Sequence, residues 1–259
     1  MEEKLKEIVK KIKQKKELAG ISDSIVEESI IRHIQKSDLF KLKSSEIKIL
    51  VKLVRAELRK YSGQFQINFK DRLKMLKENR IEDLLKTHVS TQERFDFYPE
   101  LKKIISGLNI HSILDLACGL NPLALAELGV KYYASDIKED ELEIIEEYFR
   151  ARDIDGKVFV YDIRKIKDLP LPKADLGLVL KVLDIIEKKS HKLSEEVIKQ
   201  VDVKYLLLSF PTKKLSGKPM RHPQRRWVEN LLMRLGYNFK VFESKNEIFY
   251  LIKKTLMSL

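Results

Sequence analysis

The sequence contains a single cysteine, Cys118, among its 259 residues. One cysteine excludes an intrachain disulfide framework of the kind that stabilises small secreted domains. No apolar run approaches the roughly 20 residues that a membrane-spanning helix requires, and the charged, amphipathic N-terminus has none of the features of a signal peptide. We therefore expect a soluble, cytoplasmic protein.

Internal repeats and low-complexity linkers are also absent from the sequence. Hydrophobic residues make up 44% of the chain, which is enough for a substantial core and argues against global disorder. Charged residues make up 35% of the chain, as is typical of thermophilic proteins. The length suits one large domain or one domain with a substantial extension.

Positive charge is concentrated at the two ends of the chain, and the net charge is +12 overall. Residues 1–80 contain 21 lysines and arginines against 12 aspartates and glutamates, and residues 181–259 carry a net charge of +9. Residues 81–180 have a net charge of −6. This pattern suits a polyanion such as RNA held at both ends, with a cationic cofactor in the acidic middle. A lysine-rich surface without such a partner would give similar counts.

The first 86 residues have helical periodicity. Apolar side chains recur at helical spacing within residues 2–18, and Ala19-Gly20 ends this predicted helix. Ser22-Asp23-Ser24 and Ser44-Ser45-Glu46 offer N-caps for two further helices, and shorter helices are predicted over 71–79 and 81–86. We expect a helical RNA-docking domain over residues 1–86. Its apolar stripes consist of Leu5, Ile8, Val9, Ile12, Ile25, Val26, Ile30, Ile31, Ile34, Ile47, Leu50, Val51, Val54 and Leu58.

From residue 91 onward, predicted helices and strands alternate, which is typical of an α/β fold. We predict a Rossmann-like domain over residues 87–259, with a seven-stranded, mostly parallel sheet that ends in an antiparallel C-terminal hairpin, which is the arrangement found in class I methyltransferases. The predicted strands are 113–117, 131–136, 158–162, 174–181, 204–210, 239–243 and 247–254. The predicted helices are 91–108, 139–152, 194–201 and 223–235.

The most informative segment is Ile113-Leu114-Asp115-Leu116-Ala117-Cys118-Gly119-Leu120-Asn121-Pro122. An apolar strand ends here in a turn of small residues, and Pro122 suits the first turn of the following helix. Two later strands end in Asp136 and Asp162. Acidic residues at the ends of neighbouring parallel strands predict a site for adenosine and its ribose. A full G-x-G-x-x-G motif is missing, which argues against a dinucleotide, so the sequence favours S-adenosylmethionine.

The turn after the first strand has three residues with expected roles. A side chain at position 119 would block the methionine part of the cofactor, which explains Gly119. Ala117 lines the cofactor by its backbone. Asp115 orients either the turn or the amino group of the cofactor. Cys118 is not expected to act as a nucleophile, because no histidine or other base motif surrounds it.

The two later acidic residues have competing interpretations. Asp136, which precedes Ile137, is expected to accept hydrogen bonds from the ribose hydroxyls, a demanding role that we favour over helix capping. Asp162 and Ile163 are expected to recognise the adenine amino group and cover the ring. For Asp162, helix capping is an equal alternative.

Several segments resemble one known family. They are His88-Val89-Ser90-Thr91-Gln92-Glu93-Arg94, Cys118-Gly119-Leu120-Asn121-Pro122-Leu123-Ala124, Ser135-Asp136-Ile137, Leu180-Lys181-Val182-Leu183 and Ser209-Phe210-Pro211-Thr212-Lys213-Lys214-Leu215-Ser216-Gly217-Lys218. In this order they resemble the aminoglycoside-resistance methyltransferases of small-subunit ribosomal RNA, which methylate N7 of a guanosine in the decoding site. The resemblance covers roughly residues 80–259 and implies S-adenosylmethionine as the cofactor, with no metal.

The resemblance also implies roles for single residues. Arg94 would pair with the carboxylate of the cofactor, to which a planar guanidinium is suited, and His88 would contact the cofactor or cap a helix. Lys181 lies where methyltransferases place the target base, and it would contact phosphate or the methionine part. N7 of guanine already has a free lone pair, so the enzyme needs in-line alignment and no general base.

Contacts with RNA are expected near the end of the chain. Phe210 is either a stacking partner for the flipped base or an ordinary core aromatic. A basic loop is the strongest candidate for phosphate contacts. It consists of Lys213, Lys214, Lys218, Arg221, Arg225 and Arg226.

Three alternatives stay open at this point. The segment after Lys218 departs from the more acidic family pattern, so the target base is not defined, and a housekeeping RNA methyltransferase would explain the motifs as well as a drug-resistance enzyme. The enzyme could act on a transfer RNA or on another ribosomal site. A non-catalytic ribosome-assembly factor that retains the fold is the third alternative. A monomer is expected in each case.

Overall fold

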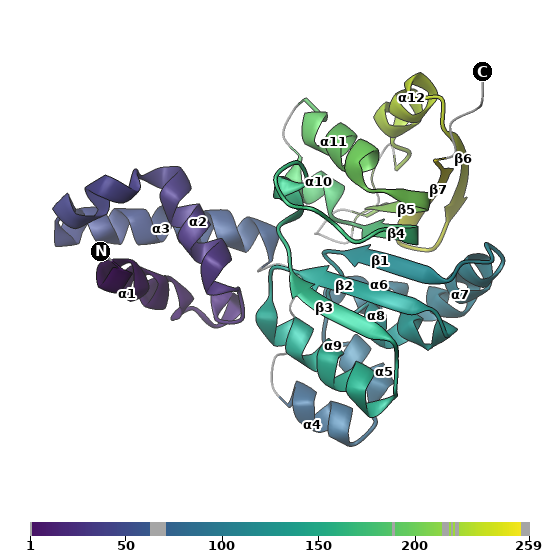
Figure 1. The fold of residues 1–259 in the computed structure, drawn as a ribbon, viewed down its shortest axis with the longest axis horizontal. Coiled ribbons are helices and arrows are strands. Elements are labelled where there is room, and N and C mark those ends of the chain that lie inside the picture. Colours follow the sequence, from purple (N-terminus) through teal and green to yellow (C-terminus); the bar gives the residue numbers. More distant parts are fainter. Residues whose placement is uncertain are drawn as a thin grey trace.

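A seven-stranded sheet forms the centre of the molecule (Figure 1). The computed structural model describes residues 2–62, 71–187, 190–213, 218, 220 and 223–254. The strand order is β3-β2-β1-β4-β5-β7-β6; β7 runs antiparallel to both of its neighbours, and all other neighbouring strands are parallel. This confirms the predicted fold class and the terminal hairpin. The strands are β1 (Ser112–Leu116), β2 (Lys131–Asp136), β3 (Gly156–Val160), β4 (Ala174–Leu180), β5 (Val203–Pro211), β6 (Asn238–Glu243) and β7 (Glu247–Lys253).

Helices cover both faces of the sheet, which explains why its central strands are nearly continuous apolar runs. The cluster on one face includes apolar residues of α7 (Tyr98–Ser106), α8 (Pro122–Leu125) and α9 (Glu139–Ala151). The cluster on the other face includes those of α10 (Leu183–Ile186), α11 (Lys192–Gln200) and α12 (Arg226–Arg234). The helix α10 was not predicted from the sequence.

The single helix predicted over 91–108 is wrong. The structure has α6 (Val89–Arg94), a short 3-10 turn (Phe95–Phe97) and then α7. The break has a physical cause, because Pro99 lies in the first turn of α7. Proline has no N–H to donate and restricts the residue before it, so it begins a helix more readily than it continues one.

The N-terminal helices form a separate bundle beside the sheet domain (Figure 1). It contains α1 (Glu2–Lys13), α2 (Asp23–His33) and α3 (Ser44–Tyr61). Most of the predicted apolar stripes lie in its core, but Ile31 is 42% exposed and does not. Among the described residues, no helix has the length and apolarity that a membrane span requires.

The division between the two packing units lies before Arg72 rather than at residue 86. Leu76 of α4 (Arg72–Lys77) belongs to the sheet cluster, as do Leu84 and Leu85 of α5 (Ile81–Leu85). Buried Arg72 donates hydrogen bonds to Thr87 and to the carboxylate of Glu141 on α9. These two short helices therefore pack on the sheet domain.

A buried and an exposed leucine on the same helix of the N-terminal bundle should contribute differently to stability. Leu58 of α3 is 0% exposed and Leu53 on the same helix is 49% exposed. We expect Leu58→Ala to lower the free energy of unfolding by about 2–5 kcal/mol, because it leaves a cavity in the core. Leu53→Ala, the matched control, should change it by no more than about 0.5 kcal/mol. Urea unfolding followed by circular dichroism measures both, and equal losses would contradict the packing described above.

Candidate functional site

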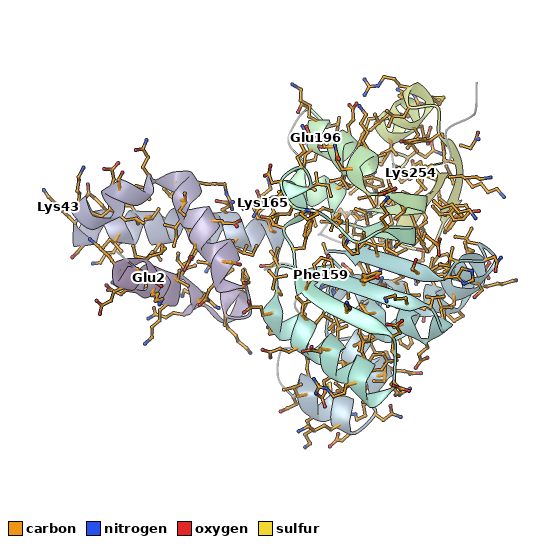
Figure 2. All side chains as sticks on the ribbon, viewed as in Figure 1. Glu2, Lys43, Phe159, Lys165, Glu196 and Lys254 are labelled. Carbon is orange, nitrogen blue, oxygen red and sulfur yellow. The ribbon has the colours of Figure 1, made fainter. Side chains whose placement is uncertain are left out.

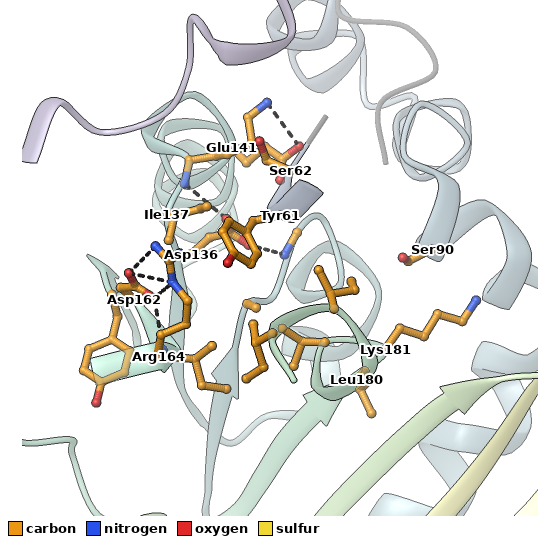
Figure 3. A pocket seen from close by; sticks show the side chains of 18 of the residues that line it. Tyr61, Ser62, Ser90, Asp136, Ile137, Glu141, Asp162, Arg164, Leu180 and Lys181 are labelled. Carbon is orange, nitrogen blue, oxygen red and sulfur yellow. Dashed lines mark hydrogen bonds and ion pairs between the residues drawn. The ribbon is translucent and has the colours of Figure 1, made fainter. Parts of the chain in front are cut away.

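A pocket opens at the carboxyl ends of β1 to β4, where the strand order reverses between β1 and β4 (Figure 3). Loops leave the sheet in opposite directions at such a reversal, which creates a crevice for ligands. The space between its walls is about 690 Å³, a figure that includes open solvent at the mouth. Its wall consists of Tyr61, Ser62, His88, Ser90, Ala117, Gly119, Asp136, Ile137, Lys138, Glu141, Tyr161, Asp162, Ile163, Arg164, Leu180, Lys181, Val182, Ile185 and Ile186.

The turn after β1 has an unusual backbone. Ala117 and Gly119 have φ values of 54° and 51°, in the left-handed region that favours glycine. A Cβ at position 119 would also lie 3.0 Å from the ring of His88. The structure thus explains Gly119 by its own backbone and by His88, in addition to the space that a ligand would need.

Asp115 lies behind this turn and is not part of the pocket wall. Its carboxylate accepts hydrogen bonds from the Asn121 amide (2.8 Å) and the Tyr132 hydroxyl (2.7 Å). Burial raises the pKa of Asp115 to about 6. Of its two predicted roles, orienting the turn is the one that these contacts support.

Asp136, the last residue of β2, faces the pocket. One carboxylate oxygen accepts the N–H of Gly119 (3.0 Å), and the other accepts the N–H of Lys138 (3.1 Å). A carboxylate has about four lone-pair positions, so it can accept further hydrogen bonds from a ligand. Burial, together with the nearby charge of Glu141, raises the pKa of Asp136 to about 7.

Asp162 lies two residues beyond β3 and is already engaged by a cation. The Arg164 guanidinium donates to both of its carboxylate oxygens, with contacts of 2.6 to 3.0 Å. The Asp162 side chain also accepts the backbone N–H of Arg164 (3.0 Å), so the capping interpretation is confirmed. Asp162 and Ile163 both line the pocket, which keeps their predicted contact with adenine as a proposal.

The structure does not bring Arg94 to the pocket wall. Its guanidinium is 2% exposed and donates to both carboxylate oxygens of Glu247 on β7, at 3.1 and 2.6 Å. A third hydrogen bond goes to Asn121 (3.2 Å). A fully buried guanidinium needs a charged partner, and Glu247 is that partner in the structure. The predicted contact of Arg94 with the cofactor carboxylate stays a prediction.

Lys181 follows β4 directly and lines the pocket, as predicted. Its φ is 60°, and its N–H donates to the carbonyl of Ser209 (3.0 Å). The ammonium group pairs with Glu93 and lies 3.7 Å from Glu247. Figure 3 shows its side chain extending toward Ser90. Lys181 therefore links the pocket to the buried Arg94–Glu247 pair.

His88 is a buried wall residue that contacts the turn at Gly119. Burial lowers the pKa of His88 to about 4, with the nearby Arg72, Lys138 and Arg94 charges acting in the same direction and Glu141 opposing them. The imidazole is therefore neutral at pH 7. It packs on the turn as a neutral ring and carries no charge toward a ligand.

Phe210 is a core residue, which is the second of the two alternatives that the sequence left open. Its side chain is 0% exposed and meets Trp227 and Tyr250 edge to face, with ring centroids 5.8 and 5.9 Å apart. Phe210 is the penultimate residue of β5, and apolar packing against α12 and β7 buries its ring.

Only some residues of the predicted basic loop are exposed at the surface. Arg225 is 9% exposed, pairs with Asp184 (2.7 Å) and lies over the Phe210 ring, so it stabilises the fold and is not available to RNA. Lys218 and Arg226 are exposed, and Lys213 is half-buried. Lys214 and Arg221 lie outside the described residues.

Sequence reasoning assigned no site role to eleven of the nineteen wall residues, among them Tyr61, Ser62, Ser90, Glu141 and Arg164. Ser90 belongs to a motif that was recognised, so its position beside the pocket could have been inferred. Tyr61 and Ser62 come from the end of α3, in the N-terminal bundle. No local pattern signals their approach to the sheet.

The buried Arg94–Glu247 pair makes a stability prediction. Glu247→Gln should lower the free energy of unfolding by about 3 kcal/mol, because it leaves the Arg94 charge buried without a counter-charge. Glu243→Gln, at an exposed position on β6, is the matched control and should have little effect. Denaturant unfolding compares the two, and similar values for both variants would contradict the pairing.

Known proteins resemble this chain in sequence. The family model described as ribosomal RNA methyltransferase (FmrO) matches residues 73–251. The 16S rRNA (guanine(1405)-N(7))-methyltransferase of Frankia casuarinae is 29% identical over 178 residues, which are 66% of this chain and 62% of that protein. The enzyme of the same name from Serratia marcescens is 31% identical over 182 residues, or 67% and 70% of the two chains. The match thus spans less than two thirds of the Frankia relative.

Solved structures resemble it in fold. The 16S rRNA methylase RmtB has a TM-score of 0.76 at 24% identity, covering 97% of this chain and 98% of RmtB. RmtF, solved in complex with S-adenosyl-L-homocysteine, has a TM-score of 0.76 at 22% identity, covering 98% and 100%. These likenesses support the class I methyltransferase fold. Because the family model matches more than half of the sequence, the chain belongs to the ribosomal RNA methyltransferase (FmrO) family.

Proposed function

We propose that this chain transfers a methyl group from S-adenosylmethionine to N7 of a guanine in 16S ribosomal RNA, near the decoding site. The observation that carries the proposal is the carboxylate of Asp136, which lies in the wall of the pocket at the strand-order reversal, next to the Gly119 turn. The names of the relatives supply the substrate and the atom.

The pocket residues fit the cofactor. Asp136 keeps lone pairs for the ribose hydroxyls after accepting two backbone N–H groups. Ile137 and Ile163 offer apolar surface for the adenine, and the backbone of Ala117 and Gly119 leaves room for the methionine part. We propose that Lys181, which directly follows the central strand β4 and lines the pocket, contacts the methionine part or the target nucleotide.

When bound, S-adenosylmethionine supplies an electrophilic methyl group on a positively charged sulfur. The chain's own contribution is to hold the target in line with that group, because guanine N7 has a lone pair and needs no deprotonation. The neutral ring of His88 and the paired ammonium of Lys181 are consistent with a positioning role. No residue of the described wall is required to take a proton from N7.

We propose that exposed basic side chains bind the RNA and that the protein acts as a monomer. Lys218 and Arg226 lie in the segment that follows β5, and the N-terminal bundle adds many lysines. Phosphate contacts of this kind set affinity and weaken with salt. The bundle would then dock on folded RNA by shape and charge rather than by sequence.

The proposed reaction can be mapped on intact 30S subunits. After incubation with the protein and S-adenosylmethionine, treatment with borohydride and aniline should cleave the RNA at a single guanosine, because N7 methylation labilises that base. Primer extension locates the break. Asp136→Ala should abolish it. No cleavage on intact subunits, with the wild-type protein folded and binding the cofactor, would contradict the N7 assignment.

Cofactor affinity should depend on pH through Asp136. Its raised pKa of about 7 means that the empty pocket holds a proton at lower pH, and a protonated carboxyl loses acceptor capacity for the ribose. Affinity for S-adenosylhomocysteine should therefore fall about tenfold between pH 8 and pH 6. Titration calorimetry measures it. Asp136→Asn should bind weakly with no such slope, and an equal slope in both proteins would assign the proton to another group.

A further inference from the structure

The pocket wall includes two residues of the N-terminal bundle, Tyr61 and Ser62, which end α3. We propose that this bundle is part of the cofactor site: Tyr61 closes the adenosine side of the pocket, and Glu57 holds it in place through Arg164. The inference rests on the function proposed above, because it takes S-adenosylmethionine as the ligand. It assigns the bundle a role in cofactor binding in addition to RNA docking.

Arg164 joins the bundle to the pocket. Its guanidinium lies 4.2 Å from the centre of the Tyr61 ring, and Figure 3 shows both side chains among the labelled wall residues. The same guanidinium donates to both carboxylate oxygens of Asp162 and pairs with Glu57 of α3 at 3.2 Å. Its side chain is only 15% exposed. One cation therefore fixes the end of α3 against the loop that follows β3.

Glu57 is itself held firmly within the bundle. Its carboxylate accepts hydrogen bonds from Ser29 (2.8 Å), Arg32 (2.7 Å) and His33 (2.8 Å), all on α2. Burial alone would raise the pKa of Glu57, but these hydrogen bonds outweigh burial and lower it. The carboxylate therefore stays ionised at neutral pH as a counter-charge for Arg164.

A second contact of the same kind lies next to Asp162. Glu28 of α2 pairs with Lys165 at 2.6 Å, and Figure 2 shows Lys165 where the bundle meets the sheet domain. The loop over residues 162–165 is thus bound by two helices of the bundle. Movement of this loop would break the ion pairs of Arg164 with Glu57 and of Lys165 with Glu28, which join it to the bundle.

The loop after Asp136 is bound to the bundle as well. The N–H of Ser22 donates to the carbonyl of Ile137 (2.9 Å), and the N–H of Glu139 donates to the carbonyl of Gly20 (2.8 Å). The approach is close, since a Cβ at Gly20 would overlap the Asp140 carboxylate. Both loops that carry the predicted adenosine contacts therefore have their positions set by the bundle.

Tyr61 has the chemistry that an adenosine wall needs. Its ring presents an aromatic face, and Ile137 and Ile163 supply apolar side chains to the same pocket. Stacking on an aromatic side chain favours a purine whatever its hydrogen-bonding pattern. Removal of the ring should weaken cofactor binding about tenfold or more.

Calorimetric titration of S-adenosylhomocysteine into the full-length chain tests this. Tyr61→Ala should weaken binding about tenfold or more, Tyr61→Phe should stay within about threefold of the wild type, and Glu57→Gln should give an intermediate loss. Leu53→Ala, exposed on the same helix, should bind as the wild type does. Thermal unfolding of each variant separates a weakened site from a damaged fold.

Two controls separate this inference from the proposed function. If the wild type does not bind S-adenosylhomocysteine, the proposed function fails and the inference fails with it. If the wild type binds, Asp136→Ala does not, and Tyr61→Ala binds within about twofold of the wild type, only the inference is overturned. Hydrogen exchange gives a readout without a mutation. The ligand should slow exchange of amides at 58–62 along with those at 117–119, and protection confined to residues beyond 72 would contradict the role of the bundle.

Discussion

The hydrogen bond from the Gly119 amide to the Asp136 carboxylate is the contact around which the site is arranged. It ties the turn after β1 to the end of β2, two parallel neighbours whose carboxyl ends lie at the same edge of the sheet. The N–H points at the carboxylate because Gly119 adopts a left-handed backbone conformation, with the neutral ring of His88 packed against it. The contact holds the proposed methionine and ribose ends of the pocket at a set separation.

The charged side chains around this contact form two groups. On one side, Arg94, Glu247 and Lys181 form a buried set of ion pairs behind the turn. On the other side, Arg164 holds Asp162 and joins it to α3. These ion pairs avoid the cost of an isolated buried ion. Asp136 differs from the charges in both groups, because its hydrogen-bond donors are two backbone amides and its pKa is raised to about 7. That makes it the wall carboxylate most ready to accept a ligand's hydroxyls.

The sequence predicted the parts of the site that depend on local patterns. Gly119, Asp136 and Lys181 each follow an apolar strand, and parallel strands bring their carboxyl ends together whatever the rest of the chain does. The pairing of Arg94 with Glu247 was not predicted, because the two residues lie 153 positions apart and no local pattern connects them. The role of Phe210 could not be assigned from the sequence, since an apolar residue near a strand end has the same local pattern whether it packs against a helix or contacts a ligand.

Contacts between the N-terminal bundle and the sheet domain could not be predicted from the sequence either. Tyr61 ends an amphipathic helix whose periodicity predicts only which side faces its own core. The N-terminal bundle was expected to bind RNA alone, yet it contacts both loops that carry Asp136 and Asp162. An enzyme built this way would couple the surface that docks on RNA to the pocket that holds the cofactor, through Glu57 and Arg164.

The central claim is that the pocket at the strand-order reversal binds S-adenosylmethionine with its ribose on Asp136. A crystal structure of the full chain with S-adenosylhomocysteine tests this most directly. The account predicts ribose hydroxyls within about 3 Å of the Asp136 carboxylate, with the sulfur directed toward Gly119 and Lys181. A ligand bound outside this pocket, or inside it with the ribose away from Asp136, would contradict the account.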